Sequence, residues 1–91
     1  MDERNEKLDA LYATILQLDN IEDCRALLED LCTRKELKNM AERLSAAKLL
    51  MEGKTYSQVM EQGDISSATL SRVSQCVQYG KGYSKLLKNE S

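Results

Sequence analysis

Apolar residues recur every three or four positions along most of this chain, which is the spacing of one face of an α-helix. In the first such stretch, residues 6–18, they are Leu8, Leu11, Tyr12, Ile15 and Leu18. Proline is absent, and runs of β-branched or aromatic residues that alternate with polar ones are scarce, so strands are not expected. The spacing therefore predicts an all-α protein.

Residues that cap helix ends mark the next boundaries. Asn20 is placed to cap a second helix that ends near Cys32. Thr33 and Glu36 have the spacing of a capping box, which opens a third helix that runs to Gly53. The apolar stripe of this third helix is Leu37, Met40, Leu44, Ala47 and Met51.

The remaining breaks divide the rest of the chain into short helices. Gly63-Asp64 and residues 79–83 predict helices near 56–62 and 66–78 and a last helix after Gly82, which makes about six in all. The first two follow each other closely enough for a helix-turn-helix, packed through Val59, Ile65, Leu70 and Val73. Many such turns have Gly where this chain has Asp64, and Asp tolerates the left-handed conformation.

Between these apolar positions, the second short helix has small hydrogen-bonding residues and one guanidinium. These residues are Ser66, Ser67, Ala68, Thr69, Ser71 and Arg72. Small side chains let a helix approach the major groove of DNA, where hydroxyls and Arg contact base edges and phosphates. Ser66 is also placed to cap this helix and to leave free N–H groups for a phosphate. The pattern predicts DNA recognition; a Ser/Thr-rich surface helix is the plain alternative.

The start of the first short helix offers a second set of contacts. Tyr56, Ser57 and Gln58 lie where a helix-turn-helix protein commonly grips the DNA backbone. Thr55 and Gln58 also have the spacing of a capping box, which is a structural role that explains both residues without DNA.

Length and charge limit the function further. A chain of 91 residues is one domain, and with four Tyr, no Phe and no Trp its own core is small, so oligomerisation is expected. The net charge of −2 argues against indiscriminate coating of nucleic acid. The charge is uneven, because residues 1–53 carry eight basic and twelve acidic side chains, and residues 54–91 carry five and three.

The residue types for catalysis and metal binding are scarce. The chain has no His, and Cys24, Cys32 and Cys76 form no CxxC pair, so neither a metal site nor catalytic residues are predicted. No cofactor and no enzymatic activity are expected. The absence of a secretory leader and of an apolar stretch of membrane-spanning length favours a cytoplasmic, nucleoid-associated protein with no membrane partner.

Several short motifs occur in the order and spacing of a known family. They are Asp30-Leu-Cys-Thr33, Glu36-Leu37, Arg43-Leu44, Leu49-Leu50, Gly53, Thr55-Tyr56, Ser66 through Val73 and Tyr79-Gly80. Over nearly its whole length the chain thereby resembles the Trp repressor superfamily, in particular its YerC/YecD branch of Trp repressor-related proteins.

This resemblance implies one domain, residues 1–91, that forms an intertwined all-α homodimer. Residues 1–53 would supply the dimerisation helices, 54–77 the helix-turn-helix and 78–91 a C-terminal helix. It implies a transcriptional regulator, a repressor by analogy, that places two helices on a palindromic operator in double-stranded DNA. The alternative is a helical protein–protein interaction module that uses the same face without useful DNA affinity.

The resemblance also implies an effector pocket formed by Arg43, Arg72, Val73 and Cys76. In the Trp repressor, two arginines at the positions of Arg43 and Arg72 hold tryptophan. Val73 stands where the repressor has glycine, and Cys76 stands where it has a ligand-contacting serine. We therefore expect that tryptophan is not the effector and that the two arginines bind another anion, pair with acidic neighbours or contact phosphate. The existence and identity of an effector, the operator sequence, the target genes and the sign of regulation are left open.

Overall fold

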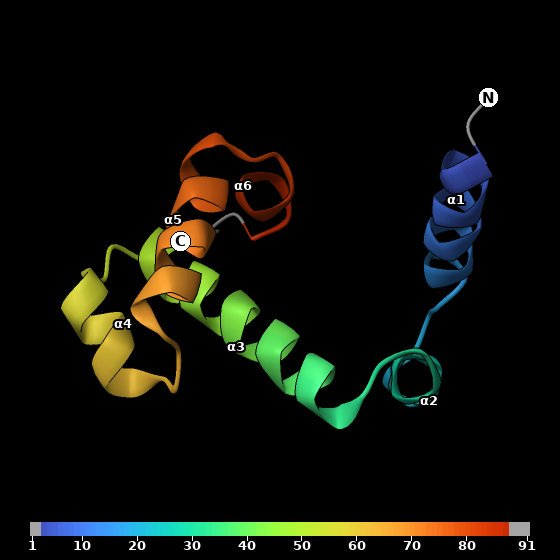
Figure 1. Ribbon diagram of the computed structural model, residues 1–91, viewed down its shortest axis with the longest axis horizontal. Coiled ribbons are helices and arrows are strands. Elements are labelled where there is room, and N and C mark those ends of the chain that lie inside the picture. Colours follow the sequence, from blue (N-terminus) through green and yellow to red (C-terminus); the bar gives the residue numbers. More distant parts are fainter. Residues whose placement is uncertain (1–2, 88–91) are drawn as a thin grey trace. The chain divides into compact units, whose positions relative to one another are not determined.

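Six α-helices make up the computed structural model, which describes residues 3–87 (Figure 1). They are α1 (Glu3–Leu16), α2 (Ile21–Leu31), α3 (Arg34–Met51), α4 (Tyr56–Gln62), α5 (Ser67–Tyr79) and α6 (Gly82–Leu86). No strand occurs in the part of the chain that the structure describes. The prediction of an all-α fold with about six helices is confirmed.

The helix starts follow the capping residues of the sequence. Asn20 accepts a hydrogen bond at 2.7 Å from the N–H of Asp23 and caps α2. At the start of α3, the hydroxyl of Thr33 accepts from the N–H of Glu36 at 3.1 Å, while the N–H of Thr33 donates to the Glu36 carboxylate at 2.8 Å. This is the reciprocal capping box expected there.

Gly53 ends α3 in the way that its position predicts. Its φ is +98°, in the left-handed region that favours glycine. The N–H of Gly53 donates to Leu50 and that of Lys54 donates to Leu49, both at 3.0 Å. These two bonds form a Schellman motif, which satisfies carbonyls that the end of a helix otherwise leaves open.

The contacts within the chain divide it into two compact units, residues 1–37 and 38–91. The first unit contains α1 and α2, and among residues 5–37 none is buried. The apolar stripe of α1 includes side chains that are well exposed, with 43% of Leu8, 56% of Tyr12 and 39% of Ile15 accessible. A single chain therefore leaves the apolar face of this unit uncovered.

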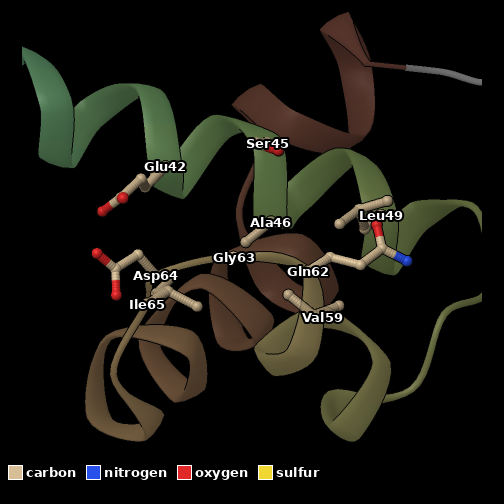
Figure 2. Close-up of a pocket in the computed structure, with 9 residues that line it drawn as sticks. All are labelled: Glu42, Ser45, Ala46, Leu49, Val59, Gln62, Gly63, Asp64 and Ile65. Atoms are coloured by element: carbon tan, nitrogen blue, oxygen red, sulfur yellow. The ribbon is translucent and has the colours of Figure 1, made fainter.

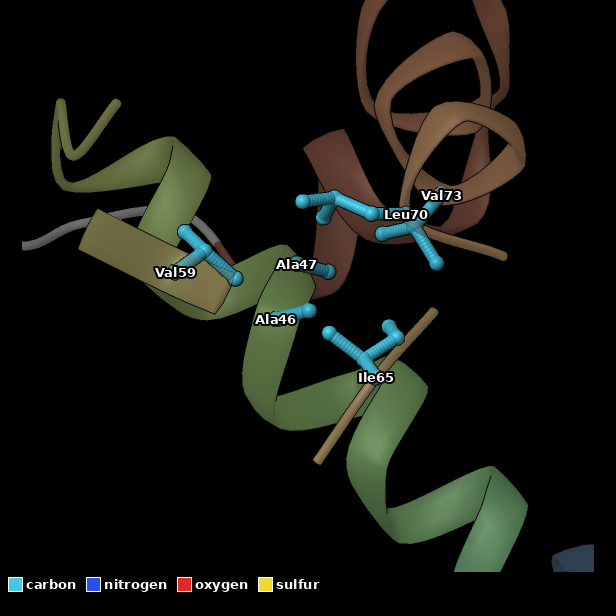
Figure 3. Packing of buried hydrophobic residues seen from close by; sticks show 6 residues of the cluster. All are labelled: Ala46, Ala47, Val59, Ile65, Leu70 and Val73. Carbon is cyan, nitrogen blue, oxygen red and sulfur yellow. The ribbon is translucent and has the colours of Figure 1, made fainter. Parts of the chain in front are cut away.

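The second unit has the buried core. Its members are Ala46 and Ala47 of α3, Val59 of α4, Ile65 of the turn, and Leu70 and Val73 of α5 (Figure 3). Half-buried residues pack against this cluster: Leu49, Leu50, Val77, Tyr83 and Leu87. All four apolar positions predicted to hold the two short helices together lie in the core.

Two expectations are corrected by the structure. The apolar stripe expected along α3 is only partly its buried face, because Met40 and Leu44 are exposed while Ala46 and Ala47 are buried. Two small residues let α4 and α5 pack close to this helix. In the turn, Asp64 is not left-handed, since no residue other than glycine has a positive φ in the described chain. Gly63 is extended, with φ −125° and ψ 169°, so the turn needs no left-handed residue.

Candidate nucleic-acid interface

The helix-turn-helix unit, consisting of α4, the turn at 63–66 and α5, turns one side of α5 inward and the other outward. Leu70 and Val73 are buried with at most 1% of their surface accessible. The opposite side is exposed at Ser66, Ser67, Ala68, Ser71 and Arg72, which we call the polar face of α5. Thr69, the remaining predicted contact in α5, is half-buried. An exposed strip of small polar residues on a firmly packed helix can approach another macromolecule closely.

The start of α5 combines a cap with free backbone donors. The Ser66 hydroxyl accepts from the N–H of Thr69 at 3.2 Å and donates to the Thr69 hydroxyl at 3.0 Å. Ser66 is thereby the N-cap that the sequence predicts, and its hydroxyl is already engaged. The N–H groups of the first turn have no carbonyl four residues earlier within the helix, so they favour an anion.

The predicted contacts at the start of α4 are all exposed. Tyr56 has 43% of its surface accessible, and Ser57 and Gln58 are also exposed. Thr55 and Gln58 form a capping box, in which the Gln58 carbonyl accepts the N–H of Thr55 at 2.8 Å. The amide NH₂ of Gln58 is the part of this side chain that remains for a ligand.

Arg72 is the cation of the polar face of α5. Among residues 5–87, the ion pair within 4.0 Å joins Lys38 and Asp64, and Arg72 belongs to no such pair. A solvent-accessible guanidinium without a carboxylate partner is suited to a phosphate or to the edge of a guanine.

The four residues predicted to form an effector pocket do not surround one cavity in a single chain. Val73 lies in the core, and Arg72 is exposed. Arg43 is half-buried and borders a cavity of about 230 Å³ between α3 and the start of α5. Cys76 borders a different cavity of about 490 Å³, lined mainly by α5, α6 and the segment between them. Arg43 and Cys76 therefore face separate spaces.

A third cavity has residues that the sequence did not single out for a site. It has a volume of about 430 Å³ and lies between α3 and the end of α4 (Figure 2). Glu42 and Asp64 line it, and both also line the cavity beside Arg43. Sequence spacing relates Glu42 to Ser45, Ala46 and Leu49 on one stripe of α3, but it gives no sign that Asp64 faces this stripe.

The described residues also bear on metal binding and on membrane insertion. No group of three or more His, Cys, Asp or Glu side chains is arranged to hold a metal ion within that part of the chain. None of the helices described there is long and apolar enough to cross a membrane.

Comparison with known proteins identifies the family. The model of the family described as Trp repressor protein matches residues 6–91. YerC of Bacillus subtilis (strain 168) is 42% identical over 77 residues, which cover 85% of this chain and 74% of YerC.

Two solved structures are similar as well. A candidate Trp repressor from Staphylococcus aureus has a TM-score of 0.85 and 37% identity, and the match covers 90% of this chain and 83% of that one. A TrpR-like protein from Eubacterium eligens has a TM-score of 0.86 and 32% identity, with 91% and 87% covered. The family is one of DNA-binding regulators. On these matches, together with the helix order and the packed helix-turn-helix unit, the chain belongs to the Trp repressor family, in the branch that includes YerC.

Proposed function

We propose that this protein is a sequence-specific DNA-binding transcriptional regulator that acts as a homodimer and represses its targets. The observation that carries the proposal is the polar face of α5, exposed on a helix whose other side is fixed in the core by Leu70 and Val73. In this proposal, Ser66, Ser67, Ala68, Thr69, Ser71 and Arg72 contact the major groove. Tyr56, Ser57 and Gln58 contact the DNA backbone at the start of α4.

The apolar surface that a single chain leaves uncovered supports the proposed homodimer. Apolar side chains of α1 and α2 are exposed, including 69% of Ile21 and 52% of Leu31, and no residue among 5–37 is buried. A second copy would cover this surface and present a second α5 to the next major groove, about 34 Å along a palindromic site. A protein that binds operator DNA in this way would be associated with the nucleoid.

The effector, if one acts through Arg43, Arg72 and Cys76, is proposed to be an anion other than tryptophan. Val73, which the resemblance places where the Trp repressor has glycine, is buried in the core of this chain. Isothermal titration calorimetry with tryptophan tests this point. Binding tighter than about 1 mM would contradict it.

The experiment that tests DNA recognition is selection of genome fragments by the purified protein without added ligand, followed by footprinting. We expect enrichment of one palindromic site. Arg72→Ala should weaken binding to that site at least tenfold, whereas Arg25→Ala, which removes an exposed arginine of α2, should not. If the Arg72→Ala variant bound the site with the same affinity as the wild-type chain, Arg72 would not be part of the DNA interface.

The net charge of −2 favours one other function, a helical module that binds protein through the same face. Salt dependence separates the two. Binding that neutralises phosphates weakens steeply as salt rises, because condensed counterions are released from DNA. A partner captured with equal affinity at 50 and about 200 mM salt, together with no selected DNA, would establish the protein interface instead.

A further inference from the structure

The helix-turn-helix unit carries little positive charge of its own. From Tyr56 to Tyr79 its charged side chains are Glu61, Asp64 and Arg72, which are two carboxylates and one guanidinium. Affinity for the phosphate backbone of DNA comes from Lys and Arg side chains that displace condensed counterions. A DNA interface built on this unit therefore gains from a cation that another part of the chain supplies.

One stripe of α3 lies opposite the turn that precedes α5. Glu42, Ser45 and Leu49 of this stripe line the same cavity as Asp64 of the turn (Figure 2). Lys38 lies one helical turn before Glu42, on the same side of α3. Its ammonium nitrogen is 3.8 Å from a carboxylate oxygen of Asp64. The packing of α3 therefore brings a cation to the turn.

This cation lies close to the start of α5. Ser66, the N-cap of α5, follows Asp64 by two residues, so the Cα atoms of the two residues are at most about 7 Å apart. The N–H groups of the first turn of α5 favour an anion, and in the proposed function this end of α5 meets DNA. Lys38 belongs to α3, but its ammonium group lies beside the surface that DNA would approach.

The ammonium group of Lys38 is free to bind a phosphate. At 3.8 Å it is too far from Asp64 for a hydrogen bond, so this carboxylate uses none of its three N–H donors. The side chains of Lys38 and Asp64 are 65% and 87% exposed. An ion pair this long and this exposed contributes little to the stability of the fold, so folding alone does not account for it.

Without Lys38, the start of α5 would be acidic. Glu42 and Arg43 both border the cavity of about 230 Å³ beside Ser66, and their opposite charges offset each other there. Asp64 borders the same cavity, and Lys38 is the cation that pairs with it. A carboxylate at this place repels phosphate unless a cation lies next to it.

We propose that Lys38 is a DNA-contacting residue, which neutralises Asp64 and donates to a backbone phosphate near the start of α5. The inference rests on the proposed function and adds to it a contact from α3, outside the helix-turn-helix unit. Because the contact is to phosphate, it adds affinity for every DNA sequence and reads no base.

The test measures the DNA affinity of the full-length Lys38→Gln variant as a function of salt, by fluorescence anisotropy with the selected fragment. The variant should bind about threefold to tenfold more weakly at low salt, and its salt slope should be smaller by about one. The difference from the wild-type chain should therefore shrink about threefold between about 50 and about 200 mM salt. A scrambled duplex should show the same change. Unchanged affinity and slope would overturn the proposal.

Lys48→Gln is the matched control. It removes the same charge from an exposed residue of α3 that does not line the cavity beside the turn. Its affinity for DNA and its salt slope should equal those of the wild-type chain. The same loss of affinity in Lys48→Gln and Lys38→Gln would show that only net charge matters and would contradict the contact. Urea denaturation of both variants establishes that the fold is retained.

Asp64→Asn separates a phosphate contact from neutralisation of the carboxylate alone. This variant should bind DNA about twofold to threefold more tightly at low salt, because a negative charge near phosphate is lost. In the Asp64→Asn background, Lys38→Gln should still lower the salt slope by about one. If the effect of Lys38→Gln disappeared in this background, Lys38 would only neutralise Asp64, and the phosphate contact would be overturned.

The same measurements separate this inference from the proposed function. If the wild-type chain selects a DNA site and Lys38→Gln binds that site equally well, the regulator stands and the contact from α3 is wrong. If the wild-type chain binds no duplex DNA at any salt concentration, both are wrong.

Discussion

A methyl group has no room at position 80. A Cβ on Gly80, which ends α5, would lie 2.5 Å from the carbonyl oxygen of Cys76, an atom of the backbone that also accepts the N–H of Gly80 at 2.8 Å. The conformation itself is ordinary, with φ −80° and ψ 178°, so the close contact is the constraint. We expect Gly80→Ala to lower the free energy of unfolding by about 1–3 kcal/mol, measured by urea denaturation.

Gly63→Ala is the matched control for this variant. A Cβ at position 63 would lie 3.5 Å from the carbonyl oxygen of Val59, which is an ordinary van der Waals contact. Its effect on the free energy of unfolding should stay within about 0.5 kcal/mol. Equal losses for the two variants would show that the contact with Cys76 does not decide the cost, because the lower entropy of the unfolded alanine chain acts in the stabilising direction.

Burial could be predicted well in the helix-turn-helix unit and less well along α3. Leu70 and Val73 are buried as their spacing predicts, because large apolar side chains on a short helix have few alternatives to the core. Ala46 was missed since a methyl group carries little hydrophobic signal on either face of a helix. The sequence also favoured Leu44, which the single chain leaves 43% exposed.

At the scale of elements, the starts of α2 to α5 could be predicted because capping depends on residues three positions apart. The turn after α4 could not be predicted as well. The expectation of a left-handed Asp64 came from other helix-turn-helix proteins, but the extended backbone at Gly63 and Ser66 connects the two helices without it. The backbone conformation of this turn depends on how α4 and α5 pack against each other. Capping residues predict where each helix starts, but they do not predict this packing.

The two roles of Ser66 can be separated at the start of α5. Ser66→Ala removes the cap and should lower the free energy of unfolding by about 0.5–2 kcal/mol. Ser66→Asp keeps an N-cap of equal quality and should keep the stability, while its charge repels phosphate. In fluorescence anisotropy with the selected DNA, we expect the Asp variant to bind at least tenfold more weakly. Unchanged DNA affinity for this variant would mean that the start of α5 does not approach the backbone of DNA.

At the scale of the whole molecule, the proposed dimer makes the exposed apolar face of α1 the surface that should control assembly. Tyr12→Glu combined with Ile15→Glu places two charges on this face and should give a monomer, with about half the mass by light scattering. Ala10→Glu combined with Ala13→Glu adds the same charge to the opposite side of α1, at residues that are also exposed, and should leave the mass unchanged. A wild-type chain of monomeric mass at micromolar concentration would contradict the dimer.

The polar face of α5 and the cavity between α3 and the end of α4 differ in how well the sequence predicts them. The polar face of α5 is contiguous in sequence, so the spacing of Ser66 to Arg72 predicts which side chains share it. The cavity of about 430 Å³ is lined by both Glu42 and Asp64, which only the packing of α3 against the helix-turn-helix unit brings together. A pair so distant in sequence has no periodic signature, so this cavity could not be predicted from the sequence.

The two alanines on the α3 side of the core bear on operator spacing. Ala46 and Ala47 are almost fully buried against α4 and α5, and Leu49 and Leu50 of the same helix pack beside them, half-buried. Because Ala47 has no accessible surface, a larger residue at this position would displace part of the helix-turn-helix unit away from α3. In the proposed dimer, the size of this residue would therefore set the separation between the two half-sites, without any change in a residue that touches DNA.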